Sequence, residues 1–123
     1  MSGGRESRAL GQWGEERVAE WLCRQGWRVL ERNFRCRMGE IDIIAENGRY
    51  LAFVEVKLRK DGQYGAACEA VTPSKQRRLR TTAQIYLAGH PTGRQPRFDV
   101  AEVYAPRGTH TEEPDIYYIE NAF

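Results

Sequence analysis

Hydrophobic periodicity divides the chain into two helices and five strands. From about Ser7 to Gln25, apolar and small residues recur at spacings of three and four, which predicts an amphipathic helix. Thr72 and Pro73 are typical of the N-cap and first residue of a second helix, and Gly89 would end it. Alternation predicts strands over residues 27–34, 97–104 and 115–123, with two more in the hairpin 39–60.

The order of these elements is helix, three strands, helix, two strands. It predicts an α/β fold in which one mixed sheet of about five strands is flanked by helices. The length of 123 residues fits a single domain, which we place at residues 9–123 after a flexible N-terminal tail of residues 1–8. The Gly-containing stretch 59–71 is predicted to be a loop.

The hairpin carries three charges at strand positions, where burial is costly. Side chains alternate along a strand, so Glu55 and Lys57 share one face. The opposite face is expected to be apolar core, formed by Ile41, Ile43, Val54, Val56 and Leu58.

The turn sets where the third charge, Asp42, points. The dipeptide Asn47-Gly48 predicts a two-residue type I′ turn, which would set Asp42 opposite Phe53 and on the face of Glu55. Diagonal neighbours lie roughly 7–8 Å apart, close enough for two carboxylates to bind one ion. A four-residue loop is expected to keep this pairing, whereas an odd loop would flip the face. A structural salt-bridge cluster is the alternative.

The two helices offer further polar groups. At about 100° per residue, Glu15 falls about 20° from Leu22, at the edge of the buried stripe, whereas Glu16 points to solvent. Gln76 shares the inner stripe of the second helix, although it is also an ordinary helical polar residue. The N-terminal part of that helix is basic, which favours phosphate binding, although such a run can also be only a solvated face. The basic residues are Lys75, Arg77, Arg78 and Arg80.

The spacing of Asp42 from Glu55-Val56-Lys57 resembles the D…ExK signature of the PD-(D/E)xK nuclease superfamily. The segment GQWGE, with Glu15, resembles the helix that supplies an upstream acid in archaeal Holliday junction resolvases. Over nearly the full domain the chain resembles the bacterial YraN-like family. The resemblance implies a restriction-endonuclease-like fold, a Mg²⁺ or Mn²⁺ ion at Asp42, Glu55 and Glu15, Lys57 as the catalytic lysine and Gln76 as a helper.

Composition indicates the cellular compartment. Three separated cysteines fit a reduced, cytoplasmic protein, and no apolar run reaches the length of a membrane span. We expect a metal-dependent endonuclease acting on DNA, for instance branched or damaged DNA, with Arg59 among its phosphate contacts. The alternatives are a nucleic-acid-binding module with a vestigial site and a protein-interaction domain. The sequence leaves open a homodimer and any role of Asp99 beyond pairing with an arginine.

Overall fold

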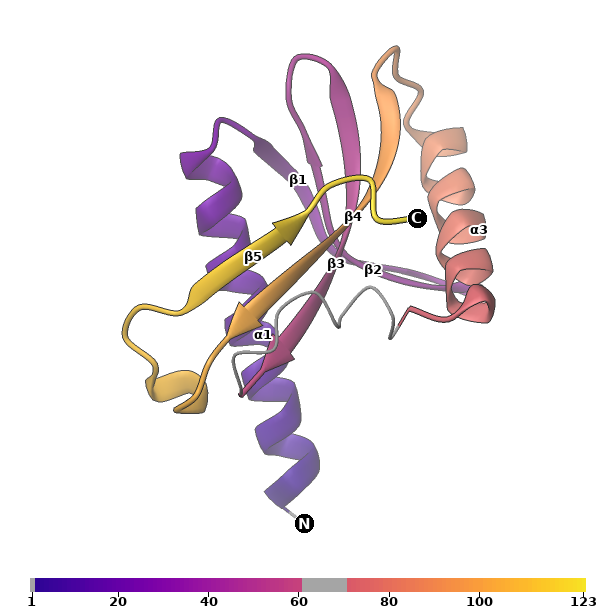
Figure 1. Cartoon of the computed structure of the whole chain (residues 1–123). Coiled ribbons are helices and arrows are strands. Elements are labelled where there is room, and N and C mark those ends of the chain that lie inside the picture. Colours follow the sequence, from indigo (N-terminus) through magenta and orange to yellow (C-terminus); the bar gives the residue numbers. More distant parts are fainter. Residues whose placement is uncertain (1, 61–70) are drawn as a thin grey trace.

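The computed structural model describes residues 2–60 and 71–123, in which five strands form one sheet. The strand order is β1-β2-β3-β4-β5, and β3 and β4 are parallel while the other neighbours are antiparallel (Figure 1). This confirms the predicted element order and the mixed sheet. The elements are α1 (Ser2–Arg24), β1 (Arg28–Cys36), β2 (Gly39–Glu46), β3 (Tyr50–Arg59), α3 (Pro73–Gly89), β4 (Gln95–Tyr104), the 3-10 turn η1 (Gly108–His110) and β5 (Asp115–Ile119).

The two helices cover opposite faces of the sheet (Figure 1). On one face, Val18 and Leu22 of α1 pack on the sheet in a core that includes Val54. On the other face, residues of α3 such as Tyr86 pack with Phe53. A parallel pair needs a crossover connection, and α3 lies within the one that joins β3 to β4. Neither helix among the described residues is long and apolar enough to cross a membrane.

The predicted boundaries of the helices and strands agree with the structure at some positions and differ at others. α3 begins as predicted, because the Thr72 side chain accepts a hydrogen bond of 3.2 Å from the backbone N–H of Lys75. α1 begins at Ser2 rather than at about Ser7, so it includes most of the predicted tail. β5 ends at Ile119 instead of residue 123. Most of the predicted loop 59–71, namely residues 61–70, lies outside the described residues.

The turn of the β2–β3 hairpin differs from the predicted one. Neither residue of the Asn47-Gly48 pair has a positive φ, so the turn is not type I′. Instead the Asn47 side chain accepts hydrogen bonds from backbone N–H groups of the turn, including that of Tyr50 at 2.7 Å. Phe53 pairs with Ile44 and not with Asp42, a shift of two residues. Within the paired region, which runs from Ile43 to Glu46 on β2, an even shift leaves the side chains on their predicted faces.

Asp99 belongs to a structural network. Its carboxylate is fully buried and accepts hydrogen bonds from Arg97 at 2.9 Å, from the Tyr118 hydroxyl at 2.6 Å and from the Asn121 backbone at 2.8 Å. The expectation that it pairs with an arginine is confirmed. The network joins β4 to β5 and to the turn that follows, and it leaves Asp99 outside the candidate site.

Candidate active site

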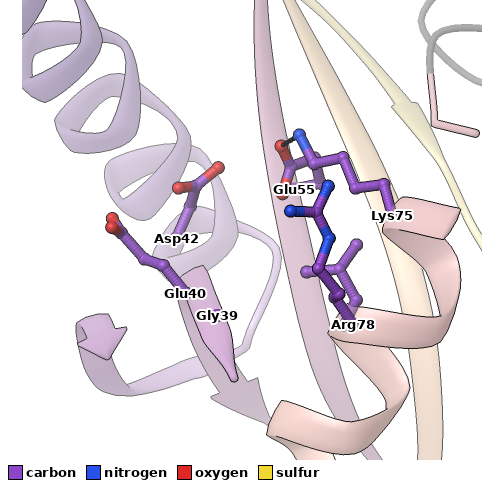
Figure 2. Close-up of a pocket in the computed structure, with 7 residues that line it drawn as sticks. Gly39, Glu40, Asp42, Glu55, Lys75 and Arg78 are labelled. Carbon is purple, nitrogen blue, oxygen red and sulfur yellow. Dashed lines mark hydrogen bonds and ion pairs between the residues drawn. The ribbon is translucent and has the colours of Figure 1, made fainter. Parts of the chain in front are cut away.

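β2 and β3 separate where the acidic residues lie. Their paired register ends at Ile43 and Val54, and beyond it the Asp42 Oδ2 atom accepts a hydrogen bond of 2.8 Å from the backbone N–H of Val56. A side chain thus takes the N–H group that a backbone partner would otherwise bind. Between the strands and α3 lies a cavity of about 310 Å³ (Figure 2), lined by Gly39, Glu40, Asp42, Glu55, Lys75, Arg78 and Leu79.

An irregularity in β1 and β2 accompanies this separation. Asn33 has φ of 55°, and it and Asp42 are skipped between two regular β1–β2 pairs. Ile43 packs in the core beneath α1, whereas Ile41 packs in the core beneath α3. Strict alternation would put both on one face, so the prediction for Ile41 was wrong. The change of face falls at Asp42, the β2 residue that is skipped in the β1–β2 pairing.

Two ammonium groups converge on the Glu55 carboxylate. The Lys75 Nζ atom of α3 lies 2.6 Å from Glu55 Oε1, and the Lys57 Nζ atom of β3 lies 3.4 Å from the same oxygen. The Glu55 side chain is only 9% exposed, so these contacts are shielded from solvent. Figure 2 shows the Lys75–Glu55 pair across the cavity from Asp42, with Arg78 beside it. The structure therefore brings Asp42, Glu55 and Lys57 together, as their strand positions predicted.

Asp42 lies in an environment that disfavours its negative charge. Burial raises its pKa to about 7, and the negative charge of Glu55 acts in the same direction, against the hydrogen bond from Val56. The carboxylates of Glu15 and Glu40 raise it further. Asp42 therefore ionises near neutral pH unless positive charge joins it.

The two lysines are pushed in opposite directions. Burial lowers the pKa of Lys57, and the neighbouring Lys75 lowers it further, against the attraction of Glu55. Burial is also the largest single influence on Lys75 and lowers its pKa, but the interactions with Glu55, Lys57 and Asp42 together outweigh burial, so the net pKa is raised. Lys75 therefore holds its proton more firmly, and Lys57 is the lysine more readily deprotonated.

Glu15 lies in an adjoining cavity of about 450 Å³, which shares Glu40 with the first. Its side chain is 12% exposed and its Oε1 atom has no hydrogen-bond partner among the described residues, with Arg32 4.0 Å away. Burial raises the pKa of Glu15, although a hydrogen bond to Asn33 and the charge of Arg32 oppose the shift. Glu15 is thus on the buried side of α1, as predicted, and Glu16 is exposed. The structure does not bring Glu15 into the cavity of Asp42 and Glu55.

The remaining predicted residues separate into different roles. Gln76 donates from Nε2 to the Val71 carbonyl at 3.0 Å, which secures the start of α3 and does not face the acids. Arg80 stacks over the rings of Phe98 and Phe123, at 5.0 and 5.8 Å. Arg59 lies 3.8 Å from the buried Glu102. Arg77 is exposed, and Arg78 reaches the cavity.

Two residues of the site have positions or contacts that were not predicted from the sequence. Glu40 lines both cavities and forms an ion pair of 3.0 Å with Arg35. Its position two residues before Asp42 on the same strand was the available signal. Lys75 was predicted as a phosphate contact, and its pairing with Glu55 depends on how α3 docks, which no local pattern reveals.

The carboxylates fit a divalent ion. Asp42 and Glu55 offer the oxygen donors that Mg²⁺ prefers, and a cation would relieve the repulsion that raises the pKa of Asp42. Within residues 2–60 and 71–123, no three His, Cys, Asp or Glu side chains gather closely enough to hold a metal by themselves. Mg²⁺ commonly takes one or two carboxylates and completes its shell with water or phosphate. Asp42 and Glu55 meet that requirement without Glu15.

The fold and this grouping of acidic and basic residues define an α/β protein of the restriction-endonuclease-like class. Residues 14–103 match the family described as "Uncharacterised protein family UPF0102". The chain is 45% identical over 118 residues to a UPF0102 protein of Alkaliphilus metalliredigens, covering 95% of this chain and 99% of that one. It is 51% identical over 100 residues to UPF0102 protein STH1475 of Symbiobacterium thermophilum, covering 79% and 83%. The chain belongs to UPF0102, the YraN-like family.

The raised pKa of Asp42 predicts an unusual effect of pH on stability. The unfolded state loses this proton near pH 3.8 and the folded state near 7, so folding stability falls as pH rises through that window. Asp42→Asn can still accept the Val56 hydrogen bond but carries no such penalty. Since one pKa unit corresponds to about 1.4 kcal/mol, we expect a melting temperature several degrees above wild type at about pH 8.

Thermal melting in EDTA between about pH 4 and 9 checks this, and the gain should vanish near pH 4. Glu16→Gln removes an exposed carboxylate from α1 and is the control, with no expected change. An Asp42→Asn protein less stable than wild type at pH 8 would show that the Asp42 charge supports the fold instead of opposing it.

Proposed function

We propose that this protein is a metal-dependent endonuclease that hydrolyses phosphodiester bonds in DNA. The observation that carries the proposal is that Asp42 and Glu55 line one cavity with Arg78, while the Lys57 Nζ atom lies 3.4 Å from Glu55 Oε1. Paired carboxylates with an adjacent lysine suit phosphoryl chemistry, which needs a held cation, an activated water and compensation of negative charge. Membership of the YraN-like family supports the same conclusion.

Each residue has a chemical task in this mechanism. Asp42 and Glu55 would hold Mg²⁺ or Mn²⁺, which supplies Lewis acidity and lowers the pKa of a water molecule. Lys57, with its lowered pKa, would accept a proton from the attacking water or, when protonated, offset charge that develops on the phosphate. Arg78 would orient the phosphate, because a guanidinium can donate two parallel hydrogen bonds to it.

The substrate surface is proposed to lie at the N-terminal end of α3. Arg77 and Arg78 are exposed there, towards the positive end of the α3 dipole, which favours anions. Arg80 is engaged with aromatic rings and Arg59 with Glu102, so neither is proposed as a primary phosphate contact. Phosphate contacts give affinity without reading base sequence, which is compatible with recognition of DNA structure.

Separate substitutions should divide cleavage from binding. Asp42→Asn, Glu55→Gln and Lys57→Met should each reduce Mn²⁺-dependent cleavage by at least about a hundredfold. DNA affinity should change by only a few fold, because it comes mainly from cationic contacts to the backbone. Glu15→Gln should cause a smaller loss, since Glu15 acts on the Asp42 cavity only through its charge.

Cleavage is measured on linear duplex, single-stranded, flapped and four-way DNA, with Mn²⁺ and with EDTA, and Glu16→Gln serves as the control. A wild-type protein that binds DNA but cuts none of these substrates would contradict the endonuclease proposal and favour the binding module. A protein that neither binds nor cuts would favour an interaction domain.

Salt dependence tests the proposed surface. Removing one cationic side chain that binds a duplex phosphate reduces the slope of log affinity against log salt concentration by about 0.9. The double variant Arg77→Gln, Arg78→Gln should therefore flatten the slope by up to about 1.8. Arg80→Gln also removes one positive charge from the same helix, and it should leave the slope unchanged. Equal flattening by Arg80→Gln would mean that the helix contributes only its overall charge.

A further inference from the structure

The Lys75 ammonium lies beside Glu55 where a metal ion bound to that carboxylate would lie. Its Nζ atom lies 2.6 Å from Glu55 Oε1, closer than the 3.4 Å of Lys57. The two lysines come from different elements, since Lys57 stands on β3 whereas Lys75 stands in the first turn of α3. Glu55 is thus the common partner of two ammonium groups while facing the cavity that it shares with Asp42.

The two ammonium groups are similarly exposed but have different surroundings. The Lys57 side chain projects from β3 beside Glu55 and is 27% exposed. The Lys75 side chain is 31% exposed and belongs to the exposed start of α3, next to Ser74. Arg78, one helical turn later, lines the same cavity. An ammonium released from Glu55 therefore has an anion-favouring surface within reach of its own helix.

The Lys75 ammonium and a divalent ion bound at Glu55 would repel each other. Metal–carboxylate oxygen distances for Mg²⁺ are about 2.0–2.1 Å, so an ion on Glu55 Oε1 would bring two more positive charges close to Lys75. Like charges at such separations repel strongly in a shielded site. Binding of the ion at Glu55 and retention of the Lys75 contact are therefore mutually unfavourable.

We propose that Lys75 is a tethered cation that competes with the divalent metal for Glu55 and, once displaced, contacts a substrate phosphate beside Arg78. This inference rests on the metal-dependent function proposed above. It follows that metal and DNA assist each other, because each stabilises the arrangement in which Lys75 has left Glu55. Such coupling is reciprocal, so the factor by which DNA strengthens metal binding equals the factor by which metal strengthens DNA binding.

Titration with Mn²⁺ alone tests the competition, with free Mn²⁺ followed by electron paramagnetic resonance. Lys75→Met keeps the length of the side chain and removes its charge, and it should tighten Mn²⁺ binding by at least about fivefold. Arg77→Met removes an equal charge two residues away without a contact to Glu55, and it should change the affinity by less than about twofold. Melting curves establish that both variants fold, and Lys75→Gln is the replacement if Lys75→Met does not.

The outcomes separate the two proposals. Equal Mn²⁺ affinities in wild type, Lys75→Met and Arg77→Met would overturn the competition while leaving the metal site intact. Absence of Mn²⁺ binding in every variant would overturn the metal-dependent function itself, and the competition with it.

A second titration tests the displaced state, with a duplex whose scissile linkages are phosphorothioates that resist cleavage. This duplex should strengthen Mn²⁺ binding to wild type several fold and should do so much less in Lys75→Met. An equal effect in both proteins would show that the released ammonium does not contact the phosphate.

Discussion

The hydrogen bond from the Val56 backbone to the Asp42 carboxylate is the contact on which the site depends. It lies just beyond the last backbone pair of β2 with β3, where a side chain takes the place of a backbone partner. The space that opens is closed on its far side by α3, which carries Lys75 and Arg78 to its lining.

The same arrangement works against stability. Two carboxylates face one cavity, and Asp42 has a pKa near 7 as a result of burial and of Glu55. Lys75 and Lys57 offset this charge at Glu55, but within residues 2–60 and 71–123 neither forms an ion pair with Asp42. Unfavourable charge held by a rigid sheet is common where a protein binds an ion or a charged intermediate. The grouping is therefore easier to understand as a functional site than as a device that stabilises the fold.

Much of the fold followed from the sequence, because periodicity and capping are local properties. The start of α3 at Thr72 and Pro73 and the buried side of Glu15 were predicted in this way. The face shared by Asp42 and Glu55 was predicted despite a wrong turn, since the register shifted by an even number of residues. Ile41 was misplaced because alternation assumes a regular strand, whereas the pairing of β2 with β1 skips Asp42, which lies between Ile41 and Ile43. The contact of Lys75 with Glu55 and the place of Glu40 in both cavities could not be predicted. They depend on how α3 docks and on how the two cavities adjoin, which are tertiary properties.

The most direct test is anomalous diffraction from crystals of the full chain soaked in Mn²⁺ near pH 8. A metal-dependent site predicts an anomalous peak between the carboxylates of Asp42 and Glu55, with the Lys75 side chain turned away from Glu55. Saturating Mn²⁺ that gives no peak at these carboxylates, with the Lys75–Glu55 ion pair intact, would contradict a metal-dependent nuclease site.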